Sequence, residues 1–235
     1  MSSFFSDPKI LEQIQYLISD FNIPFAIWET LYTTILSTIF AYVIGLPLGI
    51  LLVTGAPDGI RPLNRVGMQA ANVVINLLRS VPFLILMVML FPLSRLILGS
   101  GIGTTATIVP LTIAAAPFVA RLVEGSLREM DRGVIEAAQS MGCSTLQIVR
   151  KVMLPECLPS LANGFTTAFI TILGYGAMAG IVGGGGLGAM ALNRGYTRHK
   201  LVILYVSVIV LVILVQMFQS IGTHFSAKSD KRGKN

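Results

Sequence analysis

The sequence predicts an all-α polytopic membrane protein, and its composition and the length of its apolar runs are the observations behind this prediction. Hydrophobic residues make up 54% of the 235 residues and charged residues only 12%. The mean hydropathy is +0.77. A soluble domain carries about 25% charged residues, so 17 basic and 11 acidic side chains are too few to cover a core of this size. The bilayer is therefore the expected solvent.

Five apolar runs are long enough for membrane spans, because about 30 Å of hydrocarbon takes roughly 20 helical residues. The predicted spans are residues 30–53, 71–93, 103–120, 158–182 and 201–225, within a membrane domain at 28–225. The turn at 55–59 holds two glycines and a proline and ends the first span. The stretch from Cys157 to Leu192 is too long for one span, so it divides into the fourth helix and a glycine-rich segment.

The two ends of the chain are predicted to lie outside the bilayer core. In the N-terminal segment 1–27, Asp7 and Pro8 form a helix start, and apolar residues follow along one face at helical spacing. This pattern predicts an interfacial helix, and the acidic residues Asp7 and Glu12 argue against a cleaved signal peptide. The tail at 226–235 is basic and is expected to lie beside anionic membrane lipid instead of binding nucleic acid.

The distribution of basic residues predicts how the chain lies across the membrane. The loop after the first span, the loop at 121–157 and the tail together hold eleven of the 17 Lys and Arg residues. The loops on the opposite side hold five, and Arg79 lies within a span. Because loops rich in Lys and Arg stay in the cytoplasm, the sequence predicts an external N-terminus and a cytoplasmic C-terminus.

The cytoplasmic loop carries its own helix signals. A first helix is predicted at 131–141, and Gly142 suits the left-handed residue that follows a helix end. Ser144 and Gln147 match a capping box that opens a second helix, which is expected to end before Pro155. Two short helices joined by a turn are therefore predicted here.

A spaced motif within this loop resembles a known family signature. It reads EAA, three residues, G, nine residues, an aliphatic residue, one residue and LP, and consists of Glu136, Ala137, Ala138, Gly142, Val152, Leu154 and Pro155. The pattern resembles the EAA loop of membrane-spanning subunits of bacterial ABC importers, with Val152 in place of the usual isoleucine. The resemblance implies a coupling helix that docks into a separate ATPase subunit, where Glu136 pairs with a basic residue. A solvated hairpin without a partner is the alternative.

Motifs outside this loop resemble the methionine-importer branch of the same permeases. They are RSVPF at 79–83, IVPLT at 108–112, APF at 116–118, GY at 174–175 and the glycine run at 183–188. The resemblance implies a type I permease fold in the bacterial inner membrane, and a homodimer with two ABC ATPase subunits and a periplasmic or external substrate-binding protein. It also implies methionine as the substrate and ATP hydrolysis by the partner. A permease for another small amino acid, a secondary carrier and a membrane anchor are the alternatives.

Three side chains in or beside the spans are candidates for the transport pathway. Arg79 is expected either to reach the membrane interface or to meet a substrate carboxylate. Met87 and Met178 are expected either to contact a thioether substrate or to pack between helices.

Glycines after the fourth span form a further candidate, consisting of Gly183, Gly184, Gly185 and Gly186. This run predicts an external gate, a close backbone crossing or an ordinary turn. It formally fits GxGxxG, but the strand and the later acidic residue of a dinucleotide site are missing. The sequence also lacks a P-loop, a metal-ligand spacing and a catalytic constellation, so neither a cofactor nor enzymatic activity is expected. Gly176 and Gly180, at GxxxG spacing, are predicted to make a close helix contact.

Overall fold

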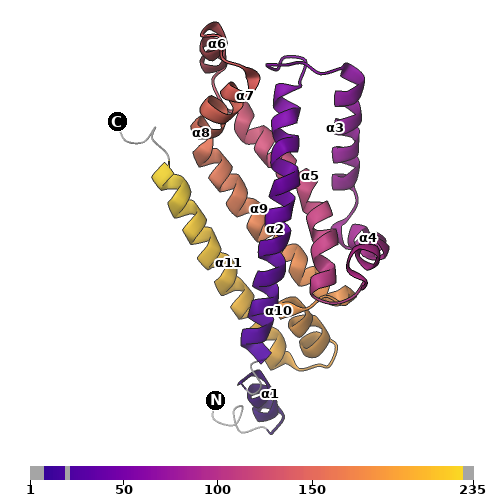
Figure 1. The fold of residues 1–235 in the computed structure, drawn as a ribbon. Helices are drawn as coiled ribbons and strands as arrows, with labels where there is room; N and C mark the ends of the chain where they lie inside the picture. The colour runs from indigo at the N-terminus through magenta and orange to yellow at the C-terminus, as the bar shows by residue number, and fades with distance from the viewer. Residues whose placement is uncertain (1–7, 19–21, 230–235) are drawn as a thin grey trace. The chain divides into compact units, whose positions relative to one another are not determined.

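The computed structural model describes residues 8–18 and 22–229, and the regular elements within these residues are all helical (Figure 1). The α-helices are α1 (Pro8–Ile18), α2 (Asn22–Thr54), α3 (Arg65–Ser80), α4 (Phe83–Leu98), α5 (Ile108–Arg128), α6 (Arg132–Ser140), α7 (Thr145–Gln147), α8 (Leu154–Glu156), α9 (Leu158–Ala179), α10 (Gly186–Ala189) and α11 (Leu201–Ser229). Two 3₁₀ turns are η2 (Thr105–Thr107) and η4 (Gly180–Val182), and two π-helical turns are η3 (Ile148–Met153) and η5 (Met190–Tyr196).

The chain divides into two compact units whose boundaries fall within long helices. Unit 1 comprises residues 1–37, 82–112 and 169–217, and unit 2 comprises 38–81, 113–168 and 218–235. Helices α2, α5, α9 and α11 contribute residues to both units. The loop that carries the EAA-like motif lies wholly in unit 2, and the glycine run lies wholly in unit 1.

Among residues 8–18 and 22–229, four helical stretches are long and apolar enough to cross a membrane, and a bent pair of helices provides a fifth if it counts as one span. The bent pair is α3 and α4, so the predicted span at 71–93 is not one continuous helix. Its break lies at Val81 (φ −77°, ψ 127°) and Pro82 (φ −55°, ψ 132°), which are both extended. A residue before proline is pushed out of the α region, and proline itself is suited to a position just before a new helix.

A glycine pair brings α2 and α5 into close contact in unit 2. A Cβ atom added at Gly45 would lie 2.7 Å from Val119 Cγ1, and one added at Gly49 would lie 2.6 Å from Val123 Cβ. Small residues four apart let two helix backbones approach closely, as in membrane helix pairs. Of the predicted pair Gly176 and Gly180, Gly180 has a close neighbour, since an added Cβ would collide with the Ala189 backbone nitrogen, whereas no heavy atom of the described residues lies within 4 Å of a Cβ added at Gly176.

Helix α1 packs against other helices of unit 1. Its Leu17 joins a buried cluster with Ala26, Leu187, Met190, Ile203 and Leu214. Lys200 Nζ lies 3.0 Å from Glu12 Oε1, and the Arg194 guanidinium lies 4.8 Å from the centre of the Tyr16 ring. The helical character expected for 8–18 is thus present, whereas Asp7 and Phe21 lie outside the described residues.

Candidate functional site

The EAA-like motif lies in a helical hairpin of residues 129–157, which starts directly after α5 ends at Arg128. Helix α5 continues to Arg128, so the polar loop is shorter at its start than the predicted 121–157. Asp131 is the N-cap of α6, and its Oδ1 accepts a hydrogen bond from the Gly133 N–H at 2.7 Å. The connection before it is fixed by the buried side chain of Met130. The first helix of the hairpin therefore has a defined start.

Gly142 ends α6 in a left-handed conformation, with φ at +77°. The Gly142 N–H donates to the Gln139 carbonyl oxygen at 2.9 Å, and the Cys143 N–H donates to the Ala138 carbonyl oxygen at 3.1 Å. This pair of bonds is the Schellman motif, in which two carbonyl groups left open at a helix end gain partners. The glycine of the sequence motif thus supplies the turn between the two helices.

The second helix begins one residue after this turn, at a reciprocal capping box. The Ser144 N–H donates to Gln147 Oε1 at 2.8 Å, and the Gln147 N–H donates to Ser144 Oγ at 3.4 Å. With the Schellman motif directly before it, only Cys143 separates the end of one cap from the start of the next. The turn has little freedom to rearrange.

The predicted end of the second helix before Pro155 is wrong. Helix α7 passes into the π-helical turn η3, where the Leu154 N–H donates to the carbonyl oxygen of Val149, five residues back. Pro155 then lies in the first turn of α8. A proline has no N–H to donate, and the wider π turn and a new first helical turn are places where that donor is not needed.

The motif residues divide into an exposed set and a buried set. Glu136 and Ala137 are exposed on α6, whereas Ala138 is only 2% exposed and faces into the hairpin, where α6 contacts η3. Val152 and Leu154 are half-buried, and Pro155 is exposed. Ile148 and Met153 form the hairpin's fully buried interior. Ala138 is therefore small because of packing inside the hairpin, while Glu136 and Ala137 lie on its exposed surface.

Two exposed apolar side chains beside the turn were not predicted as site residues. Met141 is 75% exposed and Leu146 is 74% exposed, and they flank the Gly142 turn in sequence. Their signal in the sequence is weak, since a single methionine and a single leucine in a polar loop are common. Together with the exposed Glu136 carboxylate, however, they give the hairpin both apolar and charged exposed side chains.

Glu136 also lines a small cavity of unit 2, of about 200 Å³, together with Arg128, Arg132 and Gln139. A larger cavity of about 750 Å³ is lined mainly by α5, α9 and α11. Its wall includes Glu129, Glu156, Asn163, Thr167, Thr223 and Ser226. Polar side chains on helices that are otherwise apolar are expected to face water or protein, and not lipid.

The pathway candidates lie in different surroundings. Arg79 is exposed in the last turn of α3, where a cation is favoured by the helix dipole. Met87 is fully buried in unit 1, and Met178 of the same unit is 49% exposed. Of the two methionines, only Met178 thus presents a surface that a substrate could contact.

The glycine run makes a close backbone crossing in unit 1. The Gly103 N–H donates to the Gly183 carbonyl oxygen at 2.9 Å, and Gly183 has a positive φ of +96°. A Cβ added at Gly184 would lie 2.8 Å from the Ala179 carbonyl oxygen, and one at Gly185 would lie 2.7 Å from Glu29 Oε2. A side chain at Gly184 or Gly185 would therefore collide with the backbone at Ala179 or with the Glu29 carboxylate.

Glu29 anchors this glycine run, a role that the sequence did not indicate. Its Oε2 accepts from the Gly186 N–H at 2.8 Å, and its Oε1 accepts from Thr104 Oγ1 at 2.5 Å. The adjacent Thr30 Oγ1 accepts from the Leu187 N–H at 2.9 Å. Glu29 and Gly186 are 157 positions apart, so local spacing carries no signal for this contact.

The helices and the hairpin together define an integral membrane protein that carries an exposed helical hairpin between its spans. A model of the family described as "binding-protein-dependent transport system inner membrane component" matches residues 45–227. The chain belongs to this family of transport permeases. The prediction of a non-catalytic permease in the inner membrane is thereby confirmed.

Proteins similar to this chain carry more specific names. The probable D-methionine transport system permease protein MetI of Vibrio cholerae is 49% identical over 210 residues, which are 88% of this chain and 92% of that protein. The corresponding protein of Pasteurella multocida is 46% identical, over 87% of this chain and 94% of its own length. A solved chain of the inward-facing MetNI methionine ABC transporter matches with a TM-score of 0.87 and 42% identity, over 90% of this chain and 97% of that one. The predicted fold class and the resemblance to methionine-importer permeases are confirmed.

Proposed function

We propose that this chain forms the membrane pathway of an ATP-driven methionine importer, as a homodimer bound to two ABC ATPase subunits. The similarity to proteins named as D-methionine permeases supports the choice of substrate. The observation that carries the coupling mechanism is the rigid hairpin, which holds Glu136, Met141 and Leu146 on an exposed surface. A binding protein that delivers the substrate from outside completes the proposal, in keeping with the family description.

The hairpin is suited to dock into another protein. Two consecutive caps fix its turn, so little conformational entropy is lost when a partner binds. Met141 and Leu146 supply apolar anchors, and the Glu136 carboxylate offers a charge-assisted hydrogen bond to an Arg or Lys of the ATPase. ATP binding by the ATPase dimer then moves the hairpins, and with them the helices of the permease.

The pathway itself is proposed to run along polar walls of the spans. The cavity lined by α5, α9 and α11 gives a water-accessible surface on helices that are otherwise apolar. The glycine run, Arg79 and Met178 remain candidates for gate or substrate contacts. The N-terminus is proposed to be external, and the hairpin and C-terminus cytoplasmic, because eleven of the 17 basic residues then face the cytoplasm.

The experiment is uptake into proteoliposomes that contain the permease, its ATPase and its binding protein. We expect uptake of labelled methionine that requires internal ATP and all three proteins. Uptake of methionine without ATP would favour a secondary carrier. ATP-dependent uptake of another amino acid, with methionine unable to compete, would keep the importer and reject methionine as its substrate.

Docking through the hairpin is tested by Glu136→Gln, with Glu129→Gln as the matched control. Glu129 is also an exposed glutamate, but it lies before the hairpin's first cap and outside the motif. We expect Glu136→Gln to weaken co-purification of the ATPase about tenfold, the value of one charge-assisted hydrogen bond. Equal retention of the ATPase by both variants would remove Glu136 from the docking contact.

A further inference from the structure

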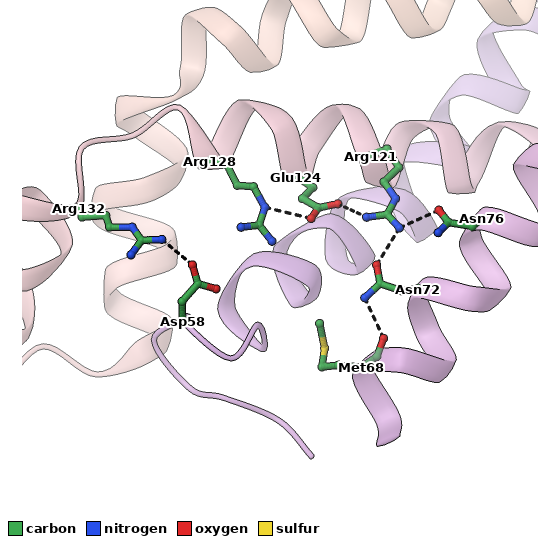
Figure 2. A network of polar contacts seen from close by, with 8 residues as sticks. All are labelled: Asp58, Met68, Asn72, Asn76, Arg121, Glu124, Arg128 and Arg132. Carbon is green, nitrogen blue, oxygen red and sulfur yellow. Dashed lines mark hydrogen bonds and ion pairs between the residues drawn. The ribbon is translucent and has the colours of Figure 1, made fainter. Parts of the chain in front are cut away.

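A network of polar side chains ties α5 to α3 within unit 2 (Figure 2). The Nη2 group of Arg121 on α5 donates to Asn72 Oδ1 at 2.7 Å and to Asn76 Oδ1 at 2.9 Å. The two asparagines are four residues apart on α3, so they present their amides on the same face of that helix. One guanidinium therefore holds two successive turns of α3.

The same guanidinium is fixed to the end of α5 that leads into the hairpin. Arg121 Nη1 lies 2.5 Å from Glu124 Oε2, and Arg128 Nε lies 3.1 Å from Glu124 Oε1. The Glu124 side chain is only 12% exposed, and both of its oxygens have a partner. Since Arg128 is the last residue of α5, the network reaches from α3 to the start of the hairpin.

A second tie joins the hairpin to the segment that precedes α3. Arg132 is the first residue of α6, and its Nη2 lies 2.5 Å from Oδ2 of Asp58 in the turn between α2 and α3 (Figure 2). Both side chains are largely exposed, so this ion pair alone contributes little stability. It joins the hairpin to the turn before α3, whereas the Arg121 network joins α5 to α3 itself.

Apolar contacts of α3 within unit 2 are few by comparison. Met68 and Ile75 are buried in a small cluster with Leu52, whereas Val66, Val73 and Leu77 are more than half exposed. Apolar contact is non-directional and lets helices slide, whereas a planar guanidinium with two amide acceptors fixes position along the helix. Arg121 is therefore suited to make α3 follow any movement of α5.

We infer that Arg121 is a positioning residue for coupled transport, which passes movement of the hairpin through α5 to α3. The inference rests on the proposed function, because it assigns a route to the coupling between ATP hydrolysis and transport. The bent pair α3 and α4 begins with the helix that Arg121 holds, so the moved element is the candidate span with a break at Val81 and Pro82. On this inference, docking to the ATPase and ATP hydrolysis are expected to continue when the link to α3 is removed.

The test removes the α3 side of the link and leaves the Arg121–Glu124 pair in place. The variant is Asn72→Ala with Asn76→Ala, compared with wild type and with the control Gln69→Ala, which shortens an exposed amide on the same helix. Each is purified with its ATPase and reconstituted with the binding protein. The measured quantities are complex yield, thermal stability, ATP hydrolysis and the methionine imported per ATP hydrolysed.

We expect the double variant to hydrolyse ATP at a rate near wild type while importing at least about tenfold less methionine per ATP, because it removes both charge-assisted hydrogen bonds that Arg121 donates to α3. Asn76→Asp keeps an acceptor for Arg121 and should retain the wild-type ratio, as should Gln69→Ala. An unchanged ratio in the double variant would overturn the inference. A fall in complex yield with an unchanged ratio would also overturn it, since the link would then serve only stability. Wild-type transport in the same assay tests the proposed function separately.

Discussion

The Cys143 N–H donates to the carbonyl oxygen of Ala138 at 3.1 Å and closes α6 over the Gly142 turn. This bond and the burial of Ala138 give the two alanines of the motif different surroundings. Ala138 belongs to the interior of the hairpin, whereas Ala137 belongs to its outer surface. Internal packing therefore requires a short side chain at Ala138, and under the proposed function approach of the ATPase requires one at Ala137.

Replacing each alanine by leucine should separate these two reasons. Ala138→Leu overpacks the hairpin and is expected to destabilise it by about 1–3 kcal/mol. Ala137→Leu should leave the hairpin folded but hinder docking, so that ATPase co-purification falls while proteolytic resistance of 129–157 stays normal. Limited proteolysis and co-purification measure the two effects, and loss of both in both variants would contradict the division.

Gly142→Val should disrupt the turn because valine does not readily adopt the φ of +77° that this position has. The expected cost is about 1–3 kcal/mol, met by strain or by loss of the Schellman bonds. Membrane insertion should survive, while ATPase docking and coupled transport should fail. Gly67→Val is the control, since Gly67 is helical and a Cβ there meets no atom within 4 Å. Normal coupling in Gly142→Val would show that the turn is not needed for docking.

The caps of the hairpin could be predicted because each depends on residues within a few positions of each other. Asp131, Gly142 and the Ser144–Gln147 pair all take the roles expected from their order in the sequence. The π turn at η3 could not be predicted, since its wider ring depends on how Pro155 is accommodated beside a buried Met153. Local hydrogen bonding determines the first set and tertiary packing the second.

Contacts between distant residues had no comparable signal. Arg121 and Asn72 are 49 positions apart, and a basic residue at a predicted span end indicates topology before it indicates a partner. GxxxG spacing occurs at both Gly45–Gly49 and Gly176–Gly180, and the sequence does not tell which of these glycines meet another helix. In the structure, added Cβ atoms at both Gly45 and Gly49 would collide with α5, whereas in the second pair only Gly180 has such a close neighbour.

Gly49→Val should therefore be more damaging than Gly176→Val. A Cβ at Gly49 would lie 2.6 Å from Val123 Cβ and 2.7 Å from the Ala120 carbonyl oxygen, so α2 and α5 must separate. The expected destabilisation is about 1–3 kcal/mol or more. Thermal unfolding in detergent of the permease alone is the measurement. If Gly176→Val lowered the melting temperature as much as Gly49→Val, close packing of α2 on α5 would not be the cause.

The proposed orientation predicts which introduced cysteines react from each side of the membrane. Ser144 is exposed in the hairpin and Tyr196 is 68% exposed in η5. In a background with Cys143 and Cys157 replaced, Ser144→Cys should react with a membrane-impermeant maleimide only after the cells are opened. Tyr196→Cys should react in intact spheroplasts. The reverse pattern would invert the topology, and reaction of both in spheroplasts would reject the single membrane crossing predicted between the two sites.

Glu29→Ala should loosen the glycine run without affecting the hairpin. The substitution removes the acceptors of the Gly186 N–H and of the Thr104 hydroxyl, which lie 2.8 Å and 2.5 Å from the carboxylate. A hydrogen bond to a charged group favours the closed form of a segment over its open form by about tenfold or more. Amide exchange at Gly186 should therefore become faster by a similar factor when the carboxylate is removed. Leu187 should respond less, since its N–H donates to Thr30 Oγ1.

Hydrogen exchange read by mass spectrometry over 183–190 measures this change, with Glu129→Ala in unit 2 as the control. Glu29→Gln keeps one oxygen acceptor and should give an intermediate rate. Exchange that is unchanged in Glu29→Ala would mean that backbone contacts such as Gly103 to Gly183 hold the run by themselves.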